Sequence, residues 1–225
     1  MLTRANLILK HLTGRLFNET SAIAALEFAL VASALTMLLL GLCDLVPAYL
    51  AYTHAGTAAS TAADLAAEYS EMQYSDMVNV YSAAADVMAP FSAANQSIRI
   101  TDVYSDGQGN AKVYWSCGNG SLPAYTARVA VTSTPTGTAL SAVLKNSANT
   151  SYILTEINYI YTAPAAFVVK SPVTLSTTAY YLPRSSAYVG FPWDGVATDM
   201  PTIPTSATKS SPVTLSNGAT CNYAN

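Results

Sequence analysis

The side chain with the most unusual chemistry in this sequence is the carboxylate of Glu27, which lies inside a long apolar segment. Between Ile23 and Cys43 the only other interruptions are Ser33, Thr36 and Gly41. A carboxylate in hydrocarbon has to find a counter-charge or take up a proton, because an unpaired charge there is costly. Charged residues inside such segments usually have a partner or a function, so Glu27 is the first candidate for a functional residue.

The apolar segment 23–43 is long enough to cross a membrane, since about 20 apolar residues in a helix span the hydrocarbon core. Glu27 lies only about one turn into this segment. Two interpretations therefore remain open: the carboxylate is held inside the membrane and needs a partner, or it reaches water at the nearer boundary.

Residue sets that are typical of enzymes do not occur in the sequence. The two histidines are His11 and His54, and His54 stands alone on a predicted helix, which favours a surface or packing residue over a base. There is no His-Glu-x-x-His, Cys-x-x-Cys or Gly-x-Ser-x-Gly motif and no phosphate-binding glycine loop. We expect no catalytic residues, no cofactor and no enzyme activity.

One segment, 102–110, partly resembles a calcium-binding loop. Asp102 and Asp106 fall at the first and fifth positions of such a loop, but Tyr104 and Val113 stand where oxygen ligands are required. The sequence therefore predicts a glycine-containing hairpin turn and no metal site.

Two of the three cysteines, Cys117 and Cys221, lie in the polar part of the chain, whereas Cys43 ends the apolar segment. If the polar part is exported, a Cys117–Cys221 disulfide would tie the C-terminal tail to the preceding domain. The alternative is two free thiols.

The length and composition suit an exported or assembling protein with one anchor and either one domain of moderate size or two small lobes. Of the 225 residues only 10% are charged, 51% are hydrophobic, and the net charge is −3. A charge this weak, without basic runs between aromatic residues, gives no support to nucleic-acid binding.

The N-terminal residues 1–22 form a short basic leader, with Arg4, Lys10 and Arg15 before the apolar segment and no further Lys or Arg until Arg99. By the positive-inside rule the N-terminus is cytoplasmic and the bulk of the chain is outside. The sequence 32–34 resembles a signal-peptidase site, but most apolar residues follow it, so a retained anchor is favoured over a removed signal.

Beyond the span, the helical pattern continues through residue 69, with Pro47 bending the helix rather than ending it. Alanines at every fourth position form one ridge, which predicts close packing of a helix or sheet, against the alternative of plain helix propensity. These are Ala51, Ala55, Ala59, Ala63 and Ala67. A second helix is expected over 71–89, with Ser75 as its N-cap, and it completes a helical region 44–90.

A β-rich head domain is expected over 91–184, followed by an irregular tail, 185–225. Alternation and β-branched content predict strands at 97–104, 111–117, 126–131, 152–161 and 168–181, the last interrupted, and a short helix at 138–146. Trp115 and the tyrosine-rich strands form either a binding face or, as we favour, a packing surface. The sequence Ser-Pro-Val-Thr-Leu-Ser occurs at 171–176 and again at 211–216, where it could form an edge strand. The fold class is thus α+β: a long membrane-spanning helix and an antiparallel sheet.

Two stretches resemble the TadE-like pseudopilins of the tight-adherence (Tad/Flp) branch of type IV pilus machinery. The first is Ala-Ala-Leu-Glu-Phe-Ala-Leu at 24–30, which is similar to that family's motif at the head of the anchor. The second is a Glu-x-x-Tyr-x-Tyr-x-x-Pro run followed by a strand that closes on Pro-Arg. The matching residues are Phe28, Glu156, Tyr159, Tyr161, Pro164, Pro183 and Arg184.

The resemblance implies a type IV pilin-like fold and a minor pilin or pseudopilin that takes part in pilus assembly and adhesion. It implies cleavage between Ala22 and Ile23 by a prepilin peptidase, although the family usually has glycine where this chain has Ala22. Glu27 would then pair with the free α-amino group of a neighbouring subunit and set the register of the fibre. Implied partners are other pilin subunits, the assembly platform and the bacterial inner membrane, crossed once. The alternative is a permanently anchored adhesin that never enters a fibre.

Overall fold

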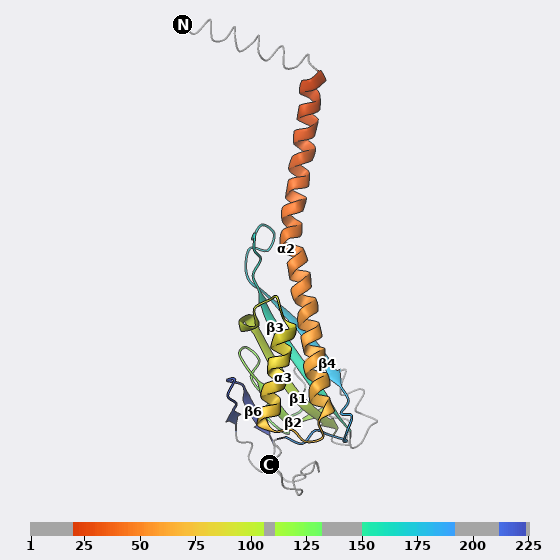
Figure 1. Ribbon diagram of the computed structural model, residues 1–225, viewed down its shortest axis with the longest axis vertical. Coiled ribbons are helices and arrows are strands. Elements are labelled where there is room, and N and C mark those ends of the chain that lie inside the picture. Colours follow the sequence, from red (N-terminus) through yellow and green to blue (C-terminus); the bar gives the residue numbers. More distant parts are fainter. Residues whose placement is uncertain (1–19, 106–110, 132–149, 192–211, 224–225) are drawn as a thin grey trace. The chain divides into compact units, whose positions relative to one another are not determined.

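The computed structural model describes residues 20–105, 111–131, 150–191 and 212–223. Within them the predicted α+β class is confirmed: a long apolar N-terminal helix precedes a small head with an antiparallel sheet (Figure 1). Contacts divide the chain into two compact units. Of the described residues, one unit comprises those up to Pro47 together with Ala163–Ser171, and the other comprises those of Ala48–Thr162 and those from Pro172 onward.

Helix α2, Thr20–Glu68, is 49 residues long and contains Pro47 without ending there, as the sequence predicted. A proline costs the helix one hydrogen bond, and the remaining turns on both sides are long enough to keep it helical. This is the one helix among the described residues that is long and apolar enough to cross a membrane, and none of its most apolar stretch is buried.

The second half of α2 packs through its alanines, which confirms the packing interpretation of the ridge. The five predicted ridge residues are fully buried. So are three alanines beside them, Ala58, Ala62 and Ala66. Side chains this small let other backbone segments come close, and a Cβ placed on Gly56 would lie 3.7 Å from the hydroxyl of Thr177.

Helix α3, Tyr74–Val87, buries Met77, Val80, Tyr81 and Ala84. The prediction of Ser75 as its N-cap was wrong, because the cap is Gln73, which precedes the helix in an extended conformation. The backbone N–H of Gln73 donates to the Asp76 carboxylate at 2.9 Å, so an acidic side chain in the first turn closes the helix start. The 3-10 turn η1, Ala93–Asn95, follows.

Among the described residues, six strands form one antiparallel sheet in the order β4-β3-β1-β2-β6-β5. Their bounds are β1 Gln96–Ser105, β2 Ala111–Gly118, β3 Ser151–Tyr161, β4 Val173–Tyr181, β5 Val213–Thr214 and β6 Thr220–Tyr223. The hairpin of β1 and β2 and the long strand β3 lie where the alternating pattern predicted them. The core between sheet and helices contains Ile98, Ile100, Trp115, Ile153 and Ile157, all nearly or fully buried.

Two predicted strands need correction, and two other predicted elements lie outside the described residues. Residues 126–131 form turns and a single bridge, from Ala130 to Lys112, rather than a strand. The positive φ of Arg128, 67°, breaks the extended conformation there. Val168 and Val169 belong to a loop, and the strand begins only after Pro172. The predicted helix at 138–146 and the turn at 106–110 lie outside the described residues.

The two copies of Ser-Pro-Val-Thr-Leu-Ser lie at opposite edges of the sheet. The first copy leads into β4, and Val213 and Thr214 of the second form β5, which pairs with β6 as the edge strand that the sequence allowed. The tail is therefore not irregular throughout: residues 213–214 and 220–223 join the sheet. Proline cannot donate a ladder hydrogen bond, so both copies have the residue type that suits the start of an edge strand.

Candidate functional site

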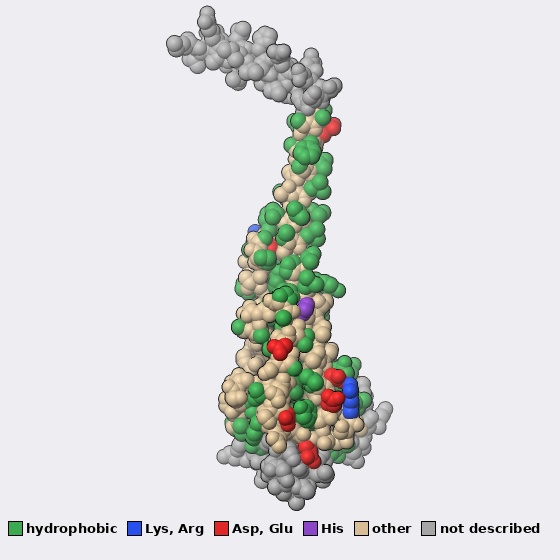
Figure 2. Space-filling model, viewed as in Figure 1, with side chains coloured by type: hydrophobic (Ala, Val, Ile, Leu, Met, Phe, Trp, Pro, Cys, Tyr) green, Lys and Arg blue, Asp and Glu red, His purple; other side chains and the backbone are tan. Residues whose placement is uncertain are grey.

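The apolar first half of α2 presents bare hydrophobic side chains along its length. Ile23 is 54% exposed and Phe28 is 74% exposed, and Glu27 is exposed between them. Figure 2 shows that hydrophobic side chains dominate this part of the helix, with few charges among them. A surface of this kind is stable only against lipid or other apolar helices, so Glu27 lies on a surface that must be covered.

Asp44 ends this apolar run. Within the part of the chain that the structure describes, its carboxylate is fully buried. It accepts hydrogen bonds from the backbone N–H groups of Ala165 at 3.1 Å, Phe167 at 2.7 Å and Val168 at 2.8 Å. Hydrogen bonds from N–H groups to a charged carboxylate are the strong kind. The segment Ala163–Ser171, which connects β3 to β4 and which we call the β3–β4 loop, is thus held on α2 by one side chain.

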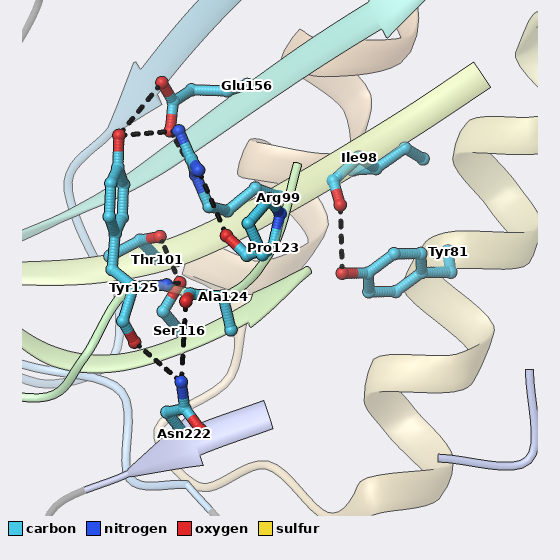
Figure 3. Close-up of polar contacts among 10 residues, drawn as sticks. All are labelled: Tyr81, Ile98, Arg99, Thr101, Ser116, Pro123, Ala124, Tyr125, Glu156 and Asn222. Carbon is cyan, nitrogen blue, oxygen red and sulfur yellow. Dashed lines mark hydrogen bonds and ion pairs between the residues drawn. The ribbon is translucent and has the colours of Figure 1, made fainter. Parts of the chain in front are cut away.

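Glu156 of the second family-like stretch lies in a buried polar cluster on the sheet (Figure 3). Arg99 of β1 is its direct cross-strand partner, and Arg99 Nε donates to Glu156 Oε2 at 2.7 Å. Both side chains are about nine-tenths buried. The charges therefore neutralise each other away from water, and separating them would leave one charge buried alone.

The remaining donors of Arg99 bind the segment that follows β2. Arg99 Nη1 donates to the Pro123 carbonyl at 3.0 Å, and Nη2 donates to the Tyr125 hydroxyl at 2.6 Å. Tyr125 in turn donates to Glu156 at 3.4 Å, and its N–H donates to the Ser116 hydroxyl (Figure 3). The side chains of Arg99, Tyr125 and Glu156 thus bind one another and hold this segment against the sheet. The cluster therefore fits a structural role rather than that of a catalytic acid or base.

Asp102 lies in β1, and its carboxylate is fully buried. Its Oδ2 accepts a hydrogen bond from the Val189 N–H at 3.1 Å, whereas Oδ1 and the Ser151 hydroxyl have no partner in hydrogen-bond geometry. Burial raises the pKa of Asp102 to about 7, and the nearby Ser151 hydroxyl and the Val189 N–H act in the opposite direction. Trp115, its cross-strand partner, donates to the Val189 carbonyl at 2.8 Å, so the two side chains together dock Val189.

The other residues of the second family-like stretch either pack in the head or bind the C-terminal part of α2. Tyr159 and Tyr161 are buried, and the ring of Tyr159 contacts Phe91 edge to face. The Arg184 side chain pairs with Asp64 of α2, and its backbone N–H donates to the Ala67 carbonyl at 2.9 Å. Pro183 is half-buried, and Pro164 is exposed in the β3–β4 loop.

Cysteine and histidine side chains have structural surroundings. A disulfide joins Cys117 of β2 to Cys221 of β6, which are direct partners in the ladder, and Cys43 is exposed. His54 contacts the Val87 carbonyl at 2.9 Å through Nδ1 and the ring of Phe91, so its predicted packing role is confirmed. Trp115 is fully buried, as the packing interpretation expected. Within the described ranges, no three His, Cys, Asp or Glu side chains gather as a metal site would require.

The predicted site residues lie in separate places rather than in one site. Ile23, Glu27 and Phe28 lie on the exposed half of α2. The residues of the second stretch are spread over the sheet and the end of α2. The side chain of Ala22 lies outside what the structure describes. Sequence reasoning missed Asp44 and Arg99 as structural centres. A signal for Asp44 existed, because it is the one Asp, Glu, Lys or Arg between Glu27 and Asp64 in the sequence.

Comparison with known families finds one match. The family model described as TadE-like protein matches residues 22–64, which contain the first family-like stretch, Asp44 and most of the alanine ridge. The resemblance is confirmed over this segment, and the second stretch lies outside it. Neither the curated proteins nor the solved structures give a match.

Proposed function

We propose that this chain, TadE-like over its N-terminal helix and therefore associated with the Tad pilus, is a minor pilin or pseudopilin that takes part in assembling the fibre. Its role is structural and involves no catalysis. Its partners are other pilin subunits, the assembly platform of the inner membrane and, at the Ala22–Ile23 bond, a prepilin peptidase. The head domain lies outside the cytoplasm, and the helix crosses the membrane once before assembly.

The observation that carries this proposal is the exposed apolar half of α2 with one carboxylate near its start. The helix is unburied from Ile23 to Val46, apart from partial cover at a few small residues and the burial of Asp44. A lone membrane anchor needs only apolar residues. A helix that leaves lipid to pack among identical helices also needs a feature that fixes its position along the fibre axis relative to its neighbours.

Glu27 supplies that feature in our proposal. Cleavage before Ile23 creates an α-amino group, and a neighbouring subunit in the correct axial position places this positive group beside the carboxylate. A subunit shifted along the axis leaves a charge unpaired in an apolar environment, which is strongly unfavourable. The pair therefore acts on specificity of assembly more than on the stability of one subunit.

A second function is favoured by one specific observation: the residue before the proposed cleavage point is Ala22, where the family usually has glycine. A chain that is not cleaved keeps its leader and has no α-amino group at Ile23. It would remain a permanently anchored adhesin, with the head domain as its binding part.

Replacement of Glu27 by alanine tests the proposal. We expect Glu27→Ala to accumulate in the membrane fraction like the unaltered chain, because the apolar run becomes more continuous, while pili are lost. Glu27→Gln, which keeps the shape without the charge, should behave in the same way. The matched control is Glu68→Ala, the same change at an exposed position at the end of the same helix, and it should leave pili normal. Normal piliation with Glu27→Ala refutes the proposed role.

A further inference from the structure

The β3–β4 loop has an apolar, exposed tip. Residues 164–169 read Pro-Ala-Ala-Phe-Val-Val, and Lys170 is the only charged residue of the segment Ala163–Ser171. Phe167 is 46% exposed and Val168 is 50% exposed. A loop of a water-exposed head has no reason to present six apolar residues in a row, so the question is what covers them.

The contacts of the loop place it at a definite level along the membrane helix. Residues 23–43 span about 31 Å at a rise of roughly 1.5 Å per residue, which matches a hydrocarbon core of about 30 Å. Asp44, which binds the loop, is the first residue beyond this span. The loop and the helix up to Pro47 form one compact unit, so the loop lies at the outer boundary of the membrane.

One contact reaches deeper than Asp44. A Cβ placed on Gly41 would lie 3.5 Å from Cγ2 of Val168, so the Val168 side chain packs over Gly41. Gly41 lies one turn before Asp44, about 4.5 Å further into the apolar span. Val168 therefore lies alongside the last turn of the membrane segment, at the depth of hydrocarbon.

Three backbone N–H groups of the loop are also satisfied without water. Unpaired N–H groups are costly in lipid, and irregular backbone enters it only when its polar groups are satisfied. Pro164 has no N–H, and the N–H groups of Ala165, Phe167 and Val168 all donate to Asp44. Without these donors, burying the charged Asp44 carboxylate at this depth would be unfavourable. The loop N–H groups and the Asp44 carboxylate therefore meet each other's need for hydrogen-bond partners.

We propose that the β3–β4 loop is a second membrane contact, which inserts Phe167 and Val168 into the outer leaflet of the bilayer and which Asp44 holds there. Lys170, exposed at the end of the tip, reaches the lipid phosphates, as basic residues beside an apolar insertion do. The occupant of the surface is lipid, because the loop is continuous with the membrane-spanning part of α2. This contact is independent of whether the chain enters a pilus.

The test measures the depth of the loop by spin labelling of the full chain. The label is attached at Ala166→Cys, an exposed position at the tip of the loop, in a Cys43→Ser background. The protein is reconstituted as single copies in nanodiscs of phosphatidylethanolamine and phosphatidylglycerol. Relaxation of the label by oxygen, which enriches in lipid, is compared with relaxation by a water-soluble nickel chelate. The matched control is Val129→Cys, an apolar residue of the head that is 54% exposed.

We expect the label at residue 166 to lose relaxation by nickel and gain relaxation by oxygen relative to the label at residue 129. Equal access to nickel at both positions overturns the proposal. The same measurement is repeated in discs that hold several copies. If the label is shielded from both reagents only in these discs, protein rather than lipid covers the loop, and this result also overturns the proposal. Asp44→Asn should return the label at residue 166 toward water, whereas Asp64→Asn should not; an unmoved label with Asp44→Asn overturns the role of the clamp.

Discussion

Replacing the buried carboxylate of Asp102 by an amide should make the head domain more stable at pH 8. The Asp102 carboxylate is fully buried, and burial raises its pKa from 3.8 to about 7. Asp102→Asn keeps the size of the side chain and cannot ionise. Its amide oxygen can accept the Val189 N–H, and its NH2 group faces the Ser151 hydroxyl, which has no partner in hydrogen-bond geometry.

The sign and size of the effect follow from linkage. Between pH 3.8 and about 7 the folded protein holds a proton on Asp102 that the unfolded chain has already lost. The free energy of unfolding therefore falls as pH rises through this window and is level above it. A shift of about three pKa units corresponds to a loss of roughly 4 kcal/mol, which is an upper bound on what Asp102→Asn recovers at pH 8.

The assay is urea unfolding of the full chain in detergent micelles, followed by tryptophan fluorescence at pH 5 and at pH 8. The unaltered protein should lose stability between these two values, and Asp102→Asn should remove most of that difference. Asp86→Asn, at an exposed position of α3, is the control and should keep the pH dependence of the unaltered protein. If Asp102→Asn kept the full difference, or were less stable at pH 8, the reasoning about burial would be wrong.

Three further substitutions test the packing and the ion pairs by the same unfolding assay. Arg99→Ala should lower the free energy of unfolding by about 3 kcal/mol, because it leaves Glu156 buried without its charge partner. The double variant Arg99→Met with Glu156→Leu should lose less stability than either single substitution. A loss in the double variant equal to the sum of the two single losses would contradict this. Arg184→Ala should cost no more than about 1 kcal/mol, since that ion pair is half-exposed, and a larger loss would contradict a surface role. Ala59→Leu should cost about 1–3 kcal/mol by overfilling the alanine ridge, and an unchanged midpoint would contradict close packing.

Local pattern was enough to predict the elements that depend on neighbours in the chain. The apolar run of α2, its alanine ridge and the β1–β2 hairpin all follow from periodicity, since each pattern repeats within a few residues. Even the continuation of α2 through Pro47 follows, because no other helix-breaking residues surround it. The same reasoning identified Glu27, which contrasts with every residue around it.

Apart from the Cys117–Cys221 disulfide, which the two cysteines of the polar part suggested, features that depend on distant partners could not be predicted. Asp44 binds backbone groups more than 120 residues away, and nothing local indicates that Val168 and Val169 belong to a loop held on α2 rather than to a strand. The sequence shows only the charge of Arg99, because it does not place Arg99 opposite Glu156 until the register of β1 and β3 is known. The turn at Arg128 needs a positive φ that its residue type does not announce.

The most direct test of the central claim, that the helix from Ile23 is built into a fibre in register through Glu27, is the mass of the N-terminal peptide in fibres sheared from cells. The proposal predicts a chain that begins at Ile23 in the fibre fraction, with its α-amino group free. A chain that retains residues 1–22 and occurs only in the membrane fraction would contradict the claim, and would favour the permanently anchored adhesin.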